Sequence, residues 1–196
     1  MSLEGLIQWD RQATLWLNQL GTPTWDSFWL LLSDIKIWFP AYGAVMVVLL
    51  WKLGWKKGLA VVLSLVLCVV AIDQSANLVK DSVARLRPCY DAWMNRNGIR
   101  LPFGLTGHLY GFFSAHAANS FGFAVTSWLG FRLNDPGHDY RAYGCCVFIW
   151  AALMSVSRIM MGAHFLGDII VGTCYGLAVG LTLAGLFHWI VFRAKL

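Results

Sequence analysis

The sequence contains few charged residues, and this scarcity excludes an ordinary water-soluble domain. Aspartate, glutamate, lysine and arginine make up 13% of the 196 residues, whereas soluble domains average about 25%. Hydrophobic residues make up 58%, and the mean hydropathy is +0.60. The composition therefore predicts an integral membrane protein with a single domain over residues 1–196.

Three further observations narrow the class of protein. The five cysteines form no disulfide framework, and no two of them make a Cys-x-x-Cys pair. We therefore expect no thiolate metal site. The N-terminus lacks a basic segment followed by an apolar run, so we expect no cleavable signal peptide. The net charge of +5 does not indicate a nucleic-acid partner, because the basic residues are scattered among apolar segments.

Long apolar segments recur along the chain, and about 20 apolar residues suffice to cross a bilayer as a helix. Five segments come near that length, at about 37–53, 56–80, 114–133, 141–160 and 164–192. Residues 3–20 are too polar to span; they predict an amphipathic surface helix in which Trp9 and Trp16 suit the interface. Residues 25–33 predict a short aromatic surface segment. The sequence thus predicts an all-α membrane bundle of about five transmembrane helices plus an N-terminal surface helix.

Basic residues are concentrated on one side of this predicted bundle. The loop between the first two spans, the loop between the third and fourth spans, and the C-terminus share that side. They carry Lys52, Lys56, Lys57, Arg132, Arg141, Arg193 and Lys195. The positive-inside rule makes this side cytoplasmic. The long polar loop at about 88–112 and the turn between the last two spans then face the exterior.

The last predicted span carries Gly172, Gly176 and Gly180, a small-xxx-small stripe that favours close helix packing in lipid. Such a stripe serves packing within one chain more often than a dimer seam. An oligomer through these glycines is possible, and a monomer is favoured.

The densest chemical motif is the segment from Ser157 to Asp168, which lies between apolar segments where charge is costly. His164 and Asp168 are four residues apart, so a helix would place them on one face. Gly162 permits a sharp bend between the helix of Arg158 and the helix of His164. A histidine held by a carboxylate beside an arginine is an arrangement suited to phosphate chemistry.

Two more polar clusters fall at the same exterior face. Lys80 and Arg87 end the second span, and their separation of two helical turns would point them the same way. Alone, they would be typical of interfacial cations. Arg85 lies off that face and is expected at the interface. Ser114 and His116 open the third span, where free N–H groups favour anions. Because these two clusters and the segment from Ser157 to Asp168 all fall at the exterior face, we expect them to form a single functional site.

The order of these residues resembles the type 2 phosphatidic acid phosphatase (PAP2) family. It reads Lys-x6-Arg-Pro, then Ser-x-His, then Ser-Arg-x3-Gly-x-His-x3-Asp. The residues that carry it are Lys80, Arg87, Pro88, Ser114, His116, Ser157, Arg158, Gly162, His164 and Asp168. The family usually has Pro-Ser-Gly-His in the second motif, where this chain has Phe113 and Ala115. Alanine still offers its backbone N–H to an anion.

The resemblance implies a lipid phosphatase that forms a phosphohistidine. His164 would attack phosphorus, Asp168 would hold its ring, and His116 would act as the general acid and base. The phosphoryl oxygens would be bound by Lys80, Arg87, Ser114, Ala115 and Arg158. We expect no cofactor and no metal, because fixed cations can stabilise the developing charge and the sequence lacks a carboxylate cluster for magnesium.

The family's substrates include undecaprenyl diphosphate, phosphatidic acid, phosphatidylglycerol phosphate and lipid A phosphates; the first and last fit this chain best. The resemblance implies a bacterial inner membrane, with the site facing the periplasm. Two other functions share part of this pattern. Haloperoxidase-like activity shares the constellation on a soluble fold, and five spans oppose it. A non-catalytic lipid-binding or transport protein finds support in Phe113 and Ala115, but the intact His116, His164 and Asp168 oppose it.

Overall fold

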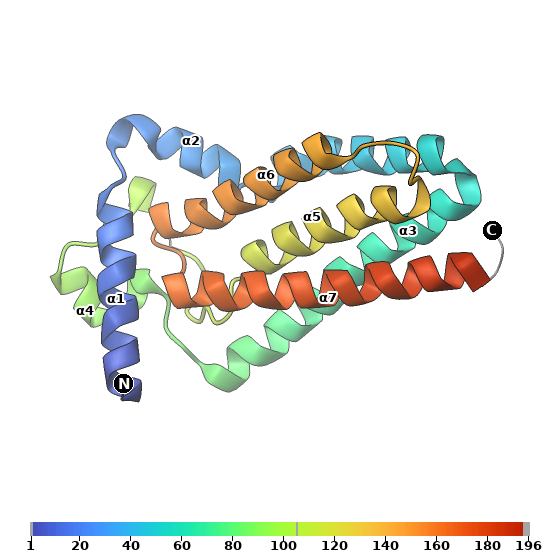
Figure 1. Ribbon diagram of the computed structural model, residues 1–196. Helices are drawn as coiled ribbons and strands as arrows, with labels where there is room; N and C mark the ends of the chain where they lie inside the picture. Colours follow the sequence, from blue (N-terminus) through green and yellow to red (C-terminus); the bar gives the residue numbers. More distant parts are fainter. Residues whose placement is uncertain (1, 105, 194–196) are drawn as a thin grey trace.

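The computed structural model describes residues 2–104 and 106–193 and consists of helices joined by turns and one long loop (Figure 1). The helices are α1 (Leu3–Gln19), α2 (Pro23–Ser33), α3 (Phe39–Val83), α4 (Ala92–Arg96), α5 (Ala115–Asn134), α6 (Arg141–Met160) and α7 (Leu166–Arg193). Within these ranges there is no strand, only one isolated bridge between Leu86 and Tyr110. The predicted all-α fold is confirmed; Lys195 lies outside the described residues.

Helix α3 contains the first two predicted spans, folded back on each other. Gly54 has a φ of +76°, a backbone conformation that favours glycine. The chain reverses there (Figure 1), so the two halves of α3 correspond to the predicted segments 37–53 and 56–80. The halves pack closely, because a Cβ added at Gly58 would lie 2.7 Å from the Cα of Leu50.

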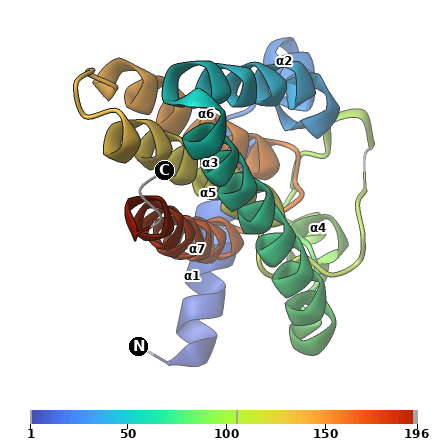
Figure 2. The same cartoon turned by 90° about the vertical axis from the view of Figure 1, so that its right-hand side faces the viewer.

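Helix α5 lies at the centre of the bundle. It packs against α3, α6 and α7 (Figure 2). In the part of the chain that the structure describes, three helical segments are long and apolar enough to cross a membrane: Ile35–Val83, Arg141–Met160 and Leu166–Arg193. Helix α5 is not among them, and its position explains why, since a helix covered by protein needs no lipid-compatible surface. The molecule is an integral membrane helical bundle.

The glycine stripe of α7 faces α5 within the same chain. A Cβ added at Gly172 would lie 2.6 Å from the carbonyl oxygen of Ser114, and one added at Gly176 would overlap the carbonyl of Ala118. The close packing within one chain that the sequence favours therefore occurs here. A monomer remains a prediction.

Substitution of Gly176 by alanine is expected to destabilise this contact. The added methyl group has no room beside the α5 backbone, and overpacking of this kind costs about 1–3 kcal/mol. Thermal unfolding in detergent measures the effect as a lowered Tm. The matched control is Gly185→Ala on the same helix, where a Cβ meets nothing within 4 Å. Equal losses of Tm in both variants would contradict the packing role of Gly176.

Helix α1 crosses the end of the bundle where α7 begins (Figure 1). Its polar residues Asp10, Thr14 and Asn18 are buried against the protein. Its apolar side chains face outward, with Trp9 52% and Trp16 63% exposed. This orientation suits a helix at the membrane surface, because lipid accepts the apolar face while the bundle's helix ends need polar partners.

Candidate active site

His164 lies in the turn that joins α6 to α7. Gly162 adopts a φ of +65°, which confirms the predicted bend. The backbone N–H groups of Ala163 and His164 both donate to the carbonyl of Arg158, at 2.9 and 3.3 Å. Helix α7 begins only at Leu166, so the prediction that His164 and Asp168 share one helix is wrong. A tight turn stands where a helical turn is expected, and it still brings His164 close to Asp168.

The carboxylate of Asp168 is close to the imidazole of His164. Nδ1 of His164 lies 3.4 Å from Oδ2 of Asp168, and both side chains are buried. The same Oδ2 accepts a hydrogen bond from the N–H of Phe165 at 3.0 Å, within the first turn of α7. This geometry is suited to fixing the orientation of the ring, because a carboxylate beside one ring nitrogen leaves the other nitrogen for chemistry.

The surroundings of His164 keep the imidazole neutral. Burial lowers the pKa of His164 well below its usual range, and the positive charges of Arg87, Arg158 and Lys80 lower it further. A neutral imidazole has a free lone pair at neutral pH, and a nucleophile needs one.

Arg87 reaches this histidine by a route that differs from the prediction. Helix α3 ends at Val83, and Ala84 adopts a left-handed φ of 48°. Lys80 stays on the last turn of the helix, so the predicted shared helix face of Lys80 and Arg87 is wrong. Arg87 instead belongs to an extended segment, where its N–H donates to the carbonyl of Leu109 at 3.1 Å.

Gly111 separates Arg87 from His164. A Cβ added at Gly111 would lie 2.7 Å from Cγ of Arg87 and 3.4 Å from Nδ1 of His164. The guanidinium is also tied to the long loop, because its Nε donates to the carbonyl of Tyr110 at 3.2 Å. The loop therefore holds Arg87 beside the histidine.

Helix α5 begins where the sequence predicts. Ser114 is its N-cap and accepts a hydrogen bond from the N–H of Ala117 at 3.4 Å. The N–H of Ser114 donates to the carbonyl of Asp168 at 3.1 Å, which joins the start of α5 to the start of α7. His116 follows in the first turn, within electrostatic range of Arg158 and His164. The second and third sequence motifs therefore meet at one place.

Arg158 and Arg87 line a small pocket. The pocket measures about 150 Å³ and also contacts Thr106, Gly107 and Ala163. Arg158 lies in the last turn of α6, and its Nε is buried and, among the described residues, has no hydrogen-bond partner. A half-buried guanidinium with an unused buried N–H next to a second arginine is an arrangement that binds oxyanions.

A larger groove of about 550 Å³ is lined in part by residues of the site. Its walls are mostly apolar side chains of the two halves of α3, including Phe39, Met46 and Val69. Ala115 and His116 also line it, and so does Asp73, which accepts a hydrogen bond from Asn119 at 2.7 Å. The groove therefore joins an apolar channel to the polar site.

Arg85 belongs to the site, and the prediction that it lies at the interface is wrong. Its Nη1 donates to Oδ1 of Asp168 at 2.6 Å, and its Nη2 donates to Oδ2 of Asp10 at 2.5 Å. Sequence reasoning missed both Arg85 and Asp10. The sequence carries no distinct signal for Asp10, because a carboxylate on the polar face of an amphipathic surface helix is ordinarily solvated.

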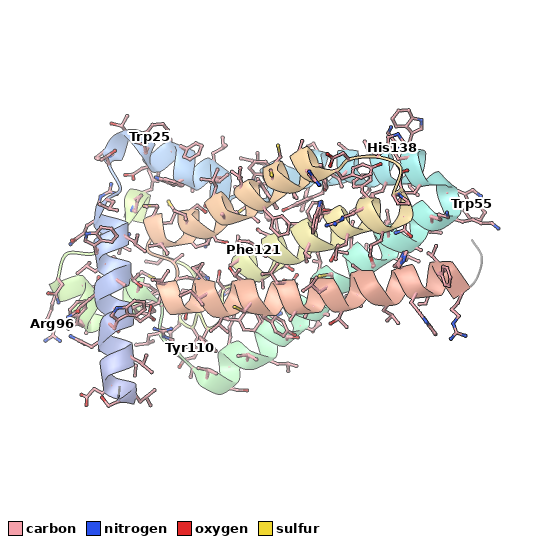
Figure 3. All side chains as sticks on the ribbon, in the orientation of Figure 1. Trp25, Trp55, Arg96, Tyr110, Phe121 and His138 are labelled. Carbon is pink, nitrogen blue, oxygen red and sulfur yellow. The ribbon has the colours of Figure 1, made fainter. Side chains whose placement is uncertain are left out.

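The site lies at the α1 end of the bundle. Figure 3 shows Tyr110 near the start of α7, and Trp55 and His138 at the opposite end. Within residues 2–104 and 106–193, no three His, Cys, Asp or Glu side chains form a group that could hold a metal ion. The groups that gather here are the carboxylates of Asp10 and Asp168, the imidazoles of His116 and His164, and several cations.

The chain is similar to known proteins both in sequence and in fold. The profile of the PAP2 superfamily matches residues 49–194. A lipid A 4'-phosphatase from Bacteroides thetaiotaomicron is 31% identical over 175 residues, which cover 89% of this chain and 75% of that protein. A lipid A 4'-phosphatase from Porphyromonas gingivalis is 31% identical over 179 residues, with 91% and 72% covered.

Two solved structures share the fold. The transmembrane PAP2-type phosphatidylglycerolphosphate phosphatase from Bacillus subtilis aligns with a TM-score of 0.71 and 16% identity, over 93% of this chain and 86% of that one. Aquifex aeolicus LpxE aligns with a TM-score of 0.63 and 19% identity, over 88% and 92%.

Proposed function

Because the chain belongs to the PAP2 superfamily, we propose that it is a membrane lipid phosphatase that removes a phosphate from a lipid A-type glycolipid through a phosphohistidine intermediate. The observation that carries the lipid part of this proposal is the mostly apolar groove of about 550 Å³ that His116 helps to line. An acyl chain in this groove would bring its headgroup to the cations of the site. The two relatives named lipid A 4'-phosphatase favour that lipid over undecaprenyl diphosphate or phosphatidylglycerol phosphate.

The first chemical step would be attack by His164 on phosphorus. Nδ1 of His164 faces Asp168, so Nε2 is the nitrogen left for the new N–P bond. The P–O bond to the lipid breaks, and His116 gives a proton to the leaving oxygen. Arg87, Arg158 and Lys80 would stabilise the charge on the phosphoryl oxygens. The N–H of Ala115 and the hydroxyl of Ser114 would complete this cradle.

The second step would return the enzyme to its starting state. His116 takes a proton from water, the resulting hydroxide attacks phosphorus, and the N–P bond breaks to release inorganic phosphate. The proton that His116 gave in the first step is thereby restored. Phe113 does not enter this scheme: it is buried and packs against Tyr175 with ring centroids 4.9 Å apart.

The proposed function is tested by phosphate release from four lipids in detergent: lipid A, undecaprenyl diphosphate, phosphatidylglycerol phosphate and phosphatidic acid. We expect the highest kcat/KM with lipid A, and mass spectrometry should show loss of the 4'-phosphate. His164→Ala serves as the blank. Release from another lipid would reassign the substrate, whereas release from none would favour a non-catalytic lipid-binding or transport protein.

We further propose that catalysis requires no metal ion. The cations of Arg87, Arg158 and Lys80 would supply the positive charge that magnesium supplies in other phosphoryl transferases. We expect kcat to remain unchanged after incubation with EDTA and dialysis, measured with the best lipid substrate. Loss of turnover that magnesium restores would contradict this proposal.

We also propose that the site faces the periplasm of a bacterial inner membrane. Figure 3 shows Trp55 and His138 at the end opposite the site, and the basic residues Lys52, Lys56, Lys57, Arg132 and Arg141 are close to these two in the sequence. The positive-inside rule makes that end cytoplasmic. A membrane-impermeant thiol reagent added to whole cells should therefore modify a His108→Cys variant and spare a His138→Cys variant. The reverse pattern would invert the orientation.

A further inference from the structure

We propose that Arg85 and Asp10 are positioning residues that couple the surface helix α1 to the carboxylate orienting His164. This inference rests on the proposed function of His164 as the nucleophile. It starts from the two hydrogen bonds of Arg85, one to Asp168 and one to Asp10. The guanidinium thus bridges a buried carboxylate of α7 and a buried carboxylate of α1.

The bridge determines which oxygen of Asp168 faces the histidine. Oδ1 of Asp168 accepts from Arg85 at 2.6 Å, whereas Oδ2 accepts from the N–H of Phe165 and lies 3.4 Å from His164. With both oxygens held, the carboxylate cannot rotate. Removal of Arg85 would leave a fully buried carboxylate without its cation, which is costly and favours rearrangement.

The guanidinium of Arg85 is itself held in place on two sides. Its Cζ lies 4.3 Å from the ring centroid of Phe165, a cation–π contact with the residue that follows His164. Asp10 holds the other side, and Oδ1 of Asp10 accepts from the N–H of Gly167 at 2.7 Å. Asp10 therefore binds both Arg85 and the backbone at the start of α7.

Helix α1 forms hydrogen bonds on both sides of the turn that carries His164, at the start of α7 and at the end of α6. Thr14 accepts from the N–H of Leu166 at 2.8 Å, at the start of α7. Asn18 donates to the carbonyls of Ile159 and Met160 at 2.9 and 3.2 Å, at the end of α6. Asp10, Thr14 and Asn18 are spaced by four residues, so they share one face of α1. This face spans the turn that carries His164.

The experiment compares variants of the full chain, purified in detergent, on two substrates: lipid A, and p-nitrophenyl phosphate, which requires no lipid recognition. We expect Arg85→Gln to lower kcat about 10- to 100-fold on both substrates with little change in KM, the usual loss when a group that orients a catalytic residue is removed. Arg85→Lys should recover part of the loss, because lysine keeps the charge but cannot bridge two carboxylates as a planar fork.

Asp10 is tested by a double-mutant cycle. Asp10→Asn should lower kcat about 10-fold, and the double variant Asp10→Asn/Arg85→Gln should be no slower than Arg85→Gln, because residues that act through one contact are not additive. The matched control is Arg11→Gln. Arg11 is the next residue of α1 and pairs with Asp91 at 2.7 Å, away from Asp168. It should keep kcat within about two-fold, as expected for a partly exposed ion pair.

The outcomes separate this inference from the proposed function. Equal losses of kcat in Arg85→Gln and Arg11→Gln, or a higher KM at unchanged kcat in Arg85→Gln, would overturn the positioning role. If Arg85→Gln fails to fold, wild-type kcat in both Arg85→Lys and Asp10→Asn would overturn it. Activity on p-nitrophenyl phosphate without activity on lipid A would sink only the lipid proposal. A wild-type protein inactive on every phosphate ester would end both.

Discussion

Replacement of His164 by alanine is expected to abolish phosphate release. Among the residues that the structure describes, His164 is a buried imidazole that lies near both Asp168 and Arg87, so its loss would leave the proposed reaction without its nucleophile. Loss of a nucleophile that works as part of a unit typically lowers kcat on the order of 10⁵- to 10⁶-fold. The measurement is release of inorganic phosphate under saturating lipid, followed for long enough to detect such a residual rate.

A trapping experiment assigns the covalent intermediate to this residue. With a substrate labelled in its phosphate, rapid quenching in base should leave label on wild-type protein and none on His164→Ala, because phosphohistidine survives alkali. His138→Ala is the matched control: this histidine is exposed and pairs with Asp135 at the far end of the bundle. Label that persists in His164→Ala would transfer the nucleophile role to another residue.

The parts of the site that depend on local chain chemistry could be predicted from the sequence. Gly162 permits the turn, and the structure has a positive φ there. Ser114 is an N-cap residue type, and α5 begins directly after it. Each of these features is decided by a residue and its immediate neighbours, so the sequence contains the required information.

The positions of Arg85 and Arg87 could not be predicted, because they depend on where α3 ends. A helix continued to Arg87 would place Arg85 off the shared face. The left-handed Ala84 ends the helix early, and the following segment is extended. In an extended chain, residues two apart point to the same side, so both arginines reach the site. No strong sequence signal predicts a left-handed alanine.

The role of α1 also depends on tertiary structure. Asp10, Thr14 and Asn18 look like the solvent face of an amphipathic helix, whereas the structure buries them. The free N–H groups that begin α7 and the carbonyls that end α6 need partners at a place that water reaches poorly. Helix α1 supplies those partners, and this requirement appears only once the two helix ends are seen to meet.

Replacement of His116 by alanine is expected to separate the two chemical steps. On lipid A the leaving group is a sugar alkoxide, which needs a proton, so kcat should fall about 10³-fold, within the range of general acid catalysis. On p-nitrophenyl phosphate the leaving group needs no proton, so attack by His164 should stay fast while hydrolysis of the intermediate slows. Stopped-flow absorbance should therefore show a burst of p-nitrophenol that approaches one equivalent per protein molecule.

The burst distinguishes proton transfer from binding. If His116 acted only as a further contact to the phosphate, its loss would slow formation of the intermediate on both substrates and no burst would appear. His188→Ala is the matched control, since His188 lies near the other end of α7 and contacts Asn134 at 3.2 Å. It should show wild-type kinetics. A burst in His116→Ala that vanishes in the double variant with His164→Ala would assign the two histidines to successive steps, because the intermediate that accumulates without the base requires the nucleophile.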